Sequence, residues 1–182
     1  MKIKKYTELN RKTVEEFRES EKFPLVVVLD NVRSMHNVGS VFRTADAFLI
    51  SGIWLCGYTP RPPHRDIQKT ALGATETVEW KYAEKTTDAV LALKQEGFEI
   101  YAIEQVEKSI PLHEFSSGNM RKIAVIFGNE VTGIDAEVLK LCDGSIEIPQ
   151  FGMKHSLNIS VAAGVVLWEL AGKTQKTNGK KL

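Results

Sequence analysis

Apolar residues along the chain follow two patterns, short continuous runs and runs with a helical period. The run FPLVVVL at 23–29 is continuous and rich in β-branched residues, which predicts a strand at Leu25–Leu29 that is buried on both faces. The next apolar residues recur at i, i+3, i+4, i+7, i+10 and i+11, which predicts a helix that begins near Asn37. They are Val38, Val41, Phe42, Ala45, Phe48 and Leu49.

The same alternation continues to the end of the chain. Further strands are predicted at Ile53–Cys56, 78–83, 98–105 and 145–151, and the segment 121–130 is predicted to be a strand that runs into a glycine loop. Further helices are predicted at 7–20, 86–97, 135–142 and 157–173, the last of them ended by Gly172. The segment 59–78 is rich in proline and charge, which indicates a long loop with one helical turn. Alternating strands and helices favour an α/β fold whose mostly parallel sheet is flanked by helices.

Length and composition fit a single globular domain over 1–182. The 182 residues, 43% of them hydrophobic, are enough to bury a core without help from metals or disulfides. Residues 1–23 are expected to form an N-terminal helical extension, and 173–182 a basic, flexible tail. The net charge of +1 is uninformative, but basic residues gather at both ends of the chain. Basic ends support nucleic-acid binding or are simply solvated.

The two cysteines, Cys56 and Cys142, lie in apolar surroundings and show neither C-x-x-C nor metal-ligand spacing. This pattern favours reduced thiols over a disulfide and indicates no metal site. An apolar signal region is missing from the N-terminus, and no apolar run reaches the ~20 residues that a membrane span needs. We therefore expect a cytoplasmic protein that does not enter a membrane.

Three polar segments follow predicted strands, at the edge where a parallel sheet binds its ligands. The first holds Asn37, Gly39 and Arg43. Asn37 fits a helix N-cap, and Gly39 permits close approach of a backbone or a ligand. Arg43 is suited to clamp a phosphate, or alternatively to pair with Asp46 at i+3.

The second polar segment runs from Gly128 to Gly133. Its spacing is neither a P-loop nor G-x-G-x-x-G, which argues against a kinase and against a dinucleotide-dependent oxidoreductase. Glu130 is expected to orient a neighbouring group, to cap the next helix, or to be solvated. This segment can therefore contribute to a ligand site, but its sequence does not identify the ligand.

The third polar segment is Gln150–Asn158, which leads into the closing helix. Ser156 there fits an N-cap. His155 precedes it without an acidic partner at a useful spacing, which disfavours a hydrolase triad. The small residues at 162–164 permit close packing against another helix or a second subunit.

Together, the segments NVGSVFRTADAF, IFGNEVTGI and IPQFGMKHSLNISVAAGVVLWE resemble the three signature motifs of the SpoU/TrmH-type ribose methyltransferases of the SPOUT superfamily. They occur in the family's order, and the resemblance spans roughly 24–172. It implies transfer of a methyl group from S-adenosylmethionine to a ribose 2′-OH of tRNA or rRNA. It also implies a SPOUT fold with a C-terminal deep trefoil knot, and a homodimer with active sites near its interface.

Carried over by position, the resemblance implies two sets of site residues. The catalytic set is Asn37, Arg43, Glu130, Ser156 and Asn158. The residues implied around S-adenosylmethionine are Ile103, Glu104, Gly128, Ile148, Met153 and Leu157. Arg43 is implied at the ribose and its phosphate, either as proton acceptor or as an orienting group. The reaction requires no metal.

The resemblance also bears on the RNA. Residues 1–23 are too few for the N-terminal RNA-binding domain that some family members carry, which leaves the dimer surface, the tail and the 59–69 loop to hold RNA. The basic residues of this loop are Arg61, His64, Arg65 and Lys69. Compact members of the family most often act on tRNA, so tRNA is favoured over rRNA. A non-catalytic RNA-binding protein that retains the fold is the remaining alternative.

Overall fold

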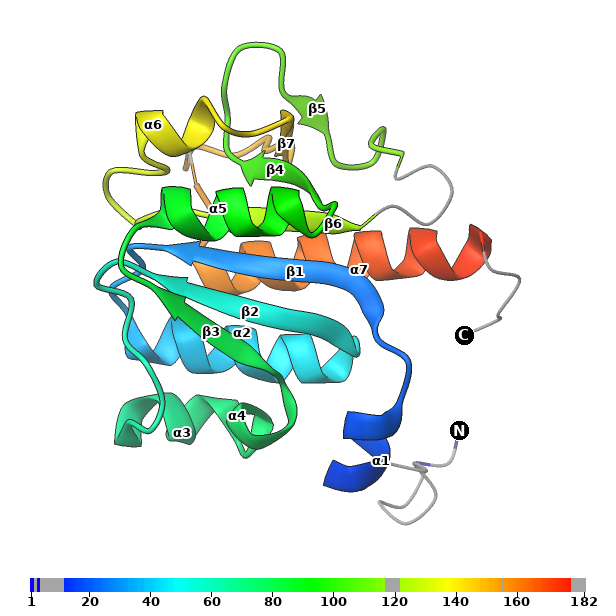
Figure 1. Cartoon of the computed structure of the whole chain (residues 1–182). Helices are drawn as coiled ribbons and strands as arrows, with labels where there is room; N and C mark the ends of the chain where they lie inside the picture. The colour runs from blue at the N-terminus through cyan, green and yellow to red at the C-terminus, as the bar shows by residue number, and fades with distance from the viewer. Residues whose placement is uncertain (2, 4–11, 117–121, 155, 178–182) are drawn as a thin grey trace.

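The central element of the computed structural model is a seven-stranded sheet in which neighbouring strands pair in parallel (Figure 1). The structure describes residues 1, 3, 12–116, 122–154 and 156–177. The strands are β1 (Phe23–Asp30), β2 (Ile50–Cys56), β3 (Trp80–Ala83), β4 (Glu99–Ile103), β5 (Ile110–Pro111), β6 (Ile123–Phe127) and β7 (Gly144–Glu147). Their order in the sheet is β3-β2-β1-β6-β4-β7-β5.

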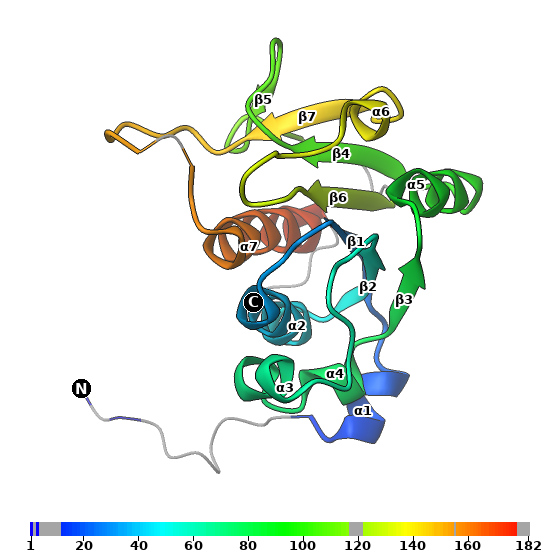
Figure 2. The ribbon, with the colours of Figure 1, turned by 90° about the vertical axis from the view of Figure 1, so that its left-hand side faces the viewer.

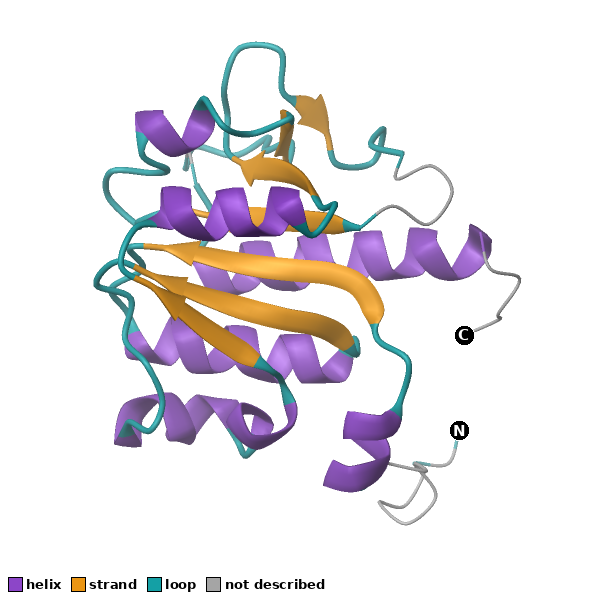
Figure 3. Cartoon of the chain, in the orientation of Figure 1, coloured by secondary structure: helices purple, strands orange, loops and turns teal. Residues whose placement is uncertain are grey.

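Helices cover both faces of the sheet, so the predicted α/β fold is confirmed (Figure 3). The helices are α1 (Val14–Glu19), α2 (Met35–Ala47), α3 (Arg65–Ala71), α4 (Ala74–Thr77), α5 (Thr86–Gln95), α6 (Ala136–Leu139) and α7 (Ile159–Thr177). The first four and α7 lie on one face, while α5 and α6 lie on the other (Figure 2).

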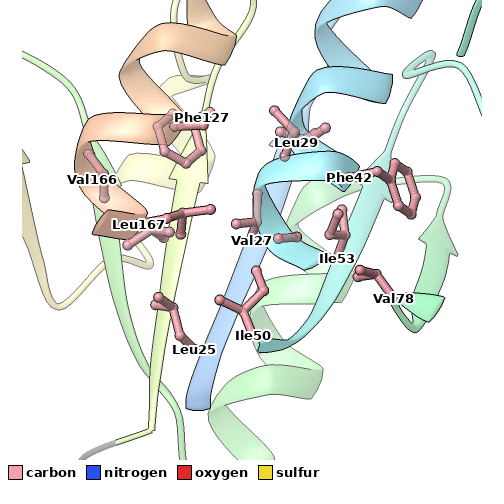
Figure 4. Close-up of a cluster of buried hydrophobic side chains, with 14 of the residues drawn as sticks. Leu25, Val27, Leu29, Phe42, Ile50, Ile53, Val78, Phe127, Val166 and Leu167 are labelled. Carbon is pink, nitrogen blue, oxygen red and sulfur yellow. The ribbon is translucent and has the colours of Figure 1, made fainter. Parts of the chain in front are cut away.

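Strand β1 is apolar from Phe23 to Leu29 because both faces of its central part are buried. Val27 and Leu29 belong to the apolar cluster under α2 and α7, part of which Figure 4 shows. Val26 and Val28 belong to the cluster under α5. A strand between two helical layers has no solvent-facing side, and this explains the continuous run that predicted it.

The structure corrects two predicted helix ends. Helix α2 begins at Met35, with Ser34 as its N-cap, so Asn37 lies inside the first turn and is not the cap. Helix α7 begins at Ile159, runs through Gly172 and ends at Thr177. A glycine with ordinary helical angles does not stop a helix, although it weakens it.

Other boundaries also differ from the expectations. Segment 59–78 contains two helices, α3 and α4, where one helical turn was expected. Strand β2 begins three residues earlier than predicted, at Ile50, and the short strand β5 was not predicted. Of the predicted helix at 7–20, the described part is α1, capped by Thr13, and residues 7–11 lie outside the described residues, as do 178–182 of the tail.

Both cysteines are free thiols, as expected, although Cys142 is only half-buried. Burial raises the pKa of Cys56 to about 12 and that of Cys142 to about 11. Within the described chain, no helix has the length and apolar character needed to span a bilayer.

Gly39 allows α2 and α3 to pack closely. A Cβ at this position would lie 2.2 Å from Thr70 Oγ1 and 2.3 Å from the carbonyl oxygen of Ile67. Of the two explanations for this glycine, close approach of another backbone is therefore the one that the structure shows. The contact fixes the helix that carries the first polar motif.

We predict that Gly39→Ala destabilises the fold and that Gly172→Ala stabilises it. Overpacking at Gly39 costs about 1–3 kcal/mol, more than the ~1 kcal/mol that alanine gains over glycine in a helix. A Cβ at Gly172 meets no atom within 4 Å, so only the helical gain remains there. Urea denaturation of both variants measures the effects, and shifts of the same sign would contradict this account.

Candidate active site at the carboxyl edge of the sheet

The three polar segments meet where the parallel strands end. Figure 2 faces this edge, toward which β1, β2 and β3 point in Figure 1. A pocket of about 330 Å³ opens here, near the lower end of the roughly 300–1,000 Å³ that is typical of small-molecule sites. Its lining comes from the ends of β4, β6 and β7 and from the segment that leads into α7.

A chain of hydrogen bonds joins all three segments at the rim of this pocket. The Glu130 carboxylate accepts hydrogen bonds from the backbone N–H groups of Arg33 (3.1 Å) and Ser34 (3.3 Å). It also accepts one from Nδ2 of Asn37 (3.2 Å), whose Oδ1 accepts one from Nδ2 of Asn158 (3.2 Å). Residues up to 121 positions apart in sequence are thus held as one unit.

Glu130 is held as a carboxylate. Partial burial raises its pKa, but the hydrogen bonds from Arg33, from its own backbone, from Asn37 and from Ser34 outweigh that effect and hold the pKa below the usual value. An ionised Glu130 accepts hydrogen bonds only, so it fixes the orientation of the Asn37 amide. Of the three roles expected for Glu130, the geometry fits the orientation of a neighbouring group, which is Asn37.

Asn158, rather than Ser156, caps helix α7. The Asn158 Oδ1 accepts hydrogen bonds from the backbone N–H of Ser160 (2.9 Å) and from its hydroxyl (2.6 Å). Ser156 lies before the helix and lines the pocket. His155 lies outside the described residues. Asn158 therefore links the start of α7 to the start of α2.

Five of the six predicted cofactor residues line the pocket. They are Ile103, Glu104, Gly128, Ile148 and Leu157. Met153 is not among the lining residues, and 82% of it is exposed. The sequence reasoning did not single out Phe127 and Ile146, which add apolar wall, or Gln105 and Gln150, which add amide groups.

Arg43 lies apart from the pocket. It is exposed on α2, six residues after Asn37 and therefore about 9 Å farther along the helix axis. It lines a separate hollow together with Phe48 and Trp168. Asp46 accepts a 2.5 Å hydrogen bond from Thr77 Oγ1, and no ion pair of Arg43 is seen among the described residues. One chain alone does not bring Arg43 to the pocket.

The basic residues of the 59–69 loop are partly engaged by the fold. Arg61 lies 4.1 Å from the centre of the Tyr82 ring, and His64 caps α3 by accepting from the N–H of Asp66. Lys69 pairs with Asp66 at 2.6 Å. Arg65 is exposed.

Asn129 anchors the second motif, and the sequence reasoning missed it. Its Nδ2 donates to the carbonyl of Asn31 (2.8 Å) and to the hydroxyl of Tyr58 (2.9 Å), while its Oδ1 accepts from the N–H groups of Val131 and Thr132. All four hydrogen-bonding positions of this buried amide are used. Its place between Gly128 and Glu130, directly after a buried strand, was the signal available.

Comparison with known proteins places this arrangement among RNA methyltransferases. The chain is 34% identical over 167 residues to a tRNA (guanosine(18)-2′-O)-methyltransferase of Thermus thermophilus, covering 92% of this chain and 84% of that protein. It is 33% identical over 154 residues to the enzyme of that name in Escherichia coli, covering 83% and 64%.

Solved structures with a similar fold also include RNA-modifying enzymes. A TrmH/SpoU tRNA modifying enzyme of A. aeolicus superposes with a TM-score of 0.79 at 27% identity, over 91% of this chain and 82% of that one. An AdoMet-bound rRNA methyltransferase of Sinorhizobium meliloti superposes with a TM-score of 0.76 at 26% identity, over 88% and 59%. The sequence model of the SpoU rRNA Methylase family matches residues 24–168. The chain therefore belongs to the SpoU methylase family.

Proposed function

We propose that this chain is an S-adenosylmethionine-dependent methyltransferase that modifies a ribose 2′-OH of tRNA. The observation that carries the proposal is the hydrogen-bonded chain Glu130–Asn37–Asn158, which assembles the three family motifs beside a pocket of cofactor size. Methyl transfer requires positioning and a path for one proton, and a rigid polar rim next to a cofactor pocket supplies the positioning.

The pocket suits S-adenosylmethionine by its volume and its lining. Ile103, Ile148 and Leu157 offer apolar surface for the adenine ring, and the backbone at Gly128 lies at the pocket wall. Glu104 offers an acceptor for the ribose hydroxyls or the amino group. When bound there, S-adenosylmethionine supplies a methyl group on a positively charged sulfur. Met153 lies outside the pocket lining, so its contact with the cofactor requires movement of residues 150–154.

The polar rim is proposed to hold the RNA ribose. Glu130 stays ionised and keeps the Asn37 amide in one orientation, which in turn holds Asn158. Ser156 lines the pocket and offers a hydroxyl to the incoming ribose. These four side chains position the substrate, and none of them has to change its protonation state.

Arg43 is proposed to bind the phosphate next to the target ribose. Its guanidinium is exposed, and its planar, bidentate set of donors suits it to orient the phosphate. Bound in this way it holds the substrate strand between itself and the pocket. As the 2′-oxygen gains the methyl group it releases its proton to solvent, so phosphate binding by Arg43 does not require Arg43 to accept that proton.

We also propose that the chain acts as a homodimer. Val161, Val165 and Trp168 are exposed by 52%, 40% and 58%, and their spacing of four and three residues places them in one stripe on α7. A second copy packed on this stripe would cover apolar surface that water otherwise contacts. The stripe lies on the helix that Asn158 caps, which puts the proposed interface close to the site.

The C-terminal part of the fold is proposed to form the trefoil knot of the SPOUT fold. The strand order supports this, because β6 enters the sheet between β1 and β4, and β7 enters between β4 and β5. The chain thus returns twice to positions between strands that are already laid down. The family resemblance provides the remaining support.

The choice of tRNA rests on the relatives. Those of 34% and 33% identity carry the name tRNA (guanosine(18)-2′-O)-methyltransferase, and guanosine 18 is the first position to test here. An rRNA ribose is the second candidate, since a structural relative is an AdoMet-bound rRNA methyltransferase. A tRNA substrate also implies that the enzyme works in the cytoplasm.

We predict that S-adenosylmethionine raises the midpoint of thermal unfolding, whereas NAD and ATP do not. A ligand at 100 times its Kd stabilises the folded state by about 2.7 kcal/mol. Leu157→Arg, which places a charged side chain at the pocket wall, should abolish the shift. Replacement of the exposed Lys140 at the end of α6, Lys140→Ala, serves as control and should retain the shift. An unchanged midpoint of the wild-type chain in S-adenosylmethionine would contradict the cofactor assignment.

We predict that the enzyme methylates a tRNA ribose and that Arg43→Ala lowers the rate at least about 100-fold, because loss of a charged positioning contact is costly in the transition state. Mass spectrometry of tRNA and rRNA from cells with and without the protein locates the modified nucleotide. Transfer from labelled S-adenosylmethionine to tRNA measures the rate, and Lys140→Ala is again the control. A near-normal rate for Arg43→Ala would show that Arg43 does not take part.

We predict that Glu130→Gln slows methyl transfer and lowers stability in a pH-dependent way. The folded-state pKa of Glu130 lies below its unfolded value of about 4.3, so its carboxylate stabilises the fold above that pH. This stabilisation disappears as the pH falls through the folded-state pKa. Urea denaturation should separate the two proteins at pH 7, and the difference should shrink as the pH falls from about 4.3 toward 3. A difference that stays constant between these pH values would contradict this role of the carboxylate.

A further inference from the structure

Tyr58 presents an exposed aromatic ring at the same edge of the sheet as the three motifs. It follows β2 by two residues, and 61% of it is exposed. The next residue, Thr59, is 2% exposed and its hydroxyl donates to the backbone carbonyls of Leu29 or Cys56. The turn is therefore anchored in the core, while the side chain of Tyr58 stays largely exposed.

The fold holds Tyr58 at both ends. Its backbone N–H donates to Oδ1 of Asn31 (3.2 Å), and its hydroxyl accepts a hydrogen bond from Nδ2 of Asn129 (2.9 Å). Gly57, with a φ of +61°, makes the turn possible, since a Cβ there would lie 2.0 Å from Asn31 Oδ1. A ring fixed in this way loses little conformational freedom when a ligand packs against it.

The partners of Tyr58 belong to the proposed active site. Asn129 precedes Glu130 in the second motif, and Asn31 lies two residues before Arg33, whose N–H donates to the Glu130 carboxylate. Arg33 and Arg61 are exposed on the segments that follow β1 and β2, and the Arg61 guanidinium packs over the ring of Tyr82. An anchored, exposed aromatic ring on an edge that also carries exposed arginines is suited to bind unpaired nucleotides.

We propose that Tyr58 stacks against a nucleobase of the RNA substrate and so positions the strand for methyl transfer. This inference rests on the proposed function. Tyr58 is not among the residues that line the cofactor pocket, so the base it meets belongs to the RNA and not to S-adenosylmethionine. Its hydroxyl accepts from Asn129, and its own proton has no acceptor within the described part of the chain, which leaves it available to the RNA.

The test compares Tyr58→Phe with Tyr58→Leu and Tyr58→Ala. Phenylalanine keeps the stacking face and loses the hydroxyl, whereas leucine keeps apolar bulk without a π-face. For an unmodified tRNA transcript we expect Tyr58→Leu and Tyr58→Ala to raise Kd and KM about 10- to 100-fold, the range that loss of one base stack produces. Tyr58→Phe should stay within about threefold of wild type, since one neutral hydrogen bond contributes modestly.

Three further readouts separate stacking from other roles. The affinity for S-adenosylmethionine, measured by calorimetry, and the oligomeric state, measured by gel filtration, should not change in any variant. Leu91→Ala removes another exposed apolar side chain, on α5, and should bind tRNA as the wild type does. Equal losses for Tyr58→Phe and Tyr58→Leu, a normal Kd for Tyr58→Ala, or dissociation of the assembly would each overturn the proposal.

The same experiments distinguish failure of this inference from failure of the proposed function. A wild-type chain that neither binds S-adenosylmethionine nor transfers its methyl group would refute the methyltransferase assignment. The tRNA affinities of the Tyr58 variants are measured without cofactor, so they test the stacking role in either case.

Discussion

The uniform direction of the strands is the constraint on which the site depends. Because the paired strands run in parallel, the segments that follow β1, β6 and β7 all emerge at one edge. There the Glu130 carboxylate accepts hydrogen bonds from the backbone N–H groups of the two residues before α2. Asn37 accepts a hydrogen bond from Asn158 and so joins the third segment to this group. Reversing a single strand would remove its polar segment from this edge.

The sequence predicted the buried elements well because burial leaves a regular pattern. The two-sided burial of β1 and the apolar face of α2 were both visible. The sequence did not reveal α3 and α4 as two helices, although Ile67, Ala71 and Ala74 are buried at helical spacing. The prolines and charged residues around these positions made the helical periodicity hard to recognise. Helix α3 packs against Gly39 of α2, and this contact helps to stabilise α3.

The site was less accessible to sequence reasoning, for a physical reason. Ser34 and Asn37 are both good caps, and only the position of Glu130, 93 residues away, makes Asn37 a bridging amide and leaves the cap to Ser34. The positions of the pocket residues came from the family resemblance rather than from periodicity. Asn129 was missed because its place after a buried strand does not reveal its partners Asn31 and Tyr58, which lie 98 and 71 positions away in the sequence.

Helix α2 links the two halves of the proposed reaction. It carries Asn37 at the pocket and Arg43 about 9 Å farther along its axis, a separation longer than any hydrogen bond. Both side chains can therefore act on one nucleotide only if the substrate spans this interval. The rise of helix α2 sets this interval, and Gly39, which lies between the two residues, seats the helix against α3. The spacing between the phosphate-binding group and the ribose-binding group is thus fixed by a helix, and the core fixes where that helix lies.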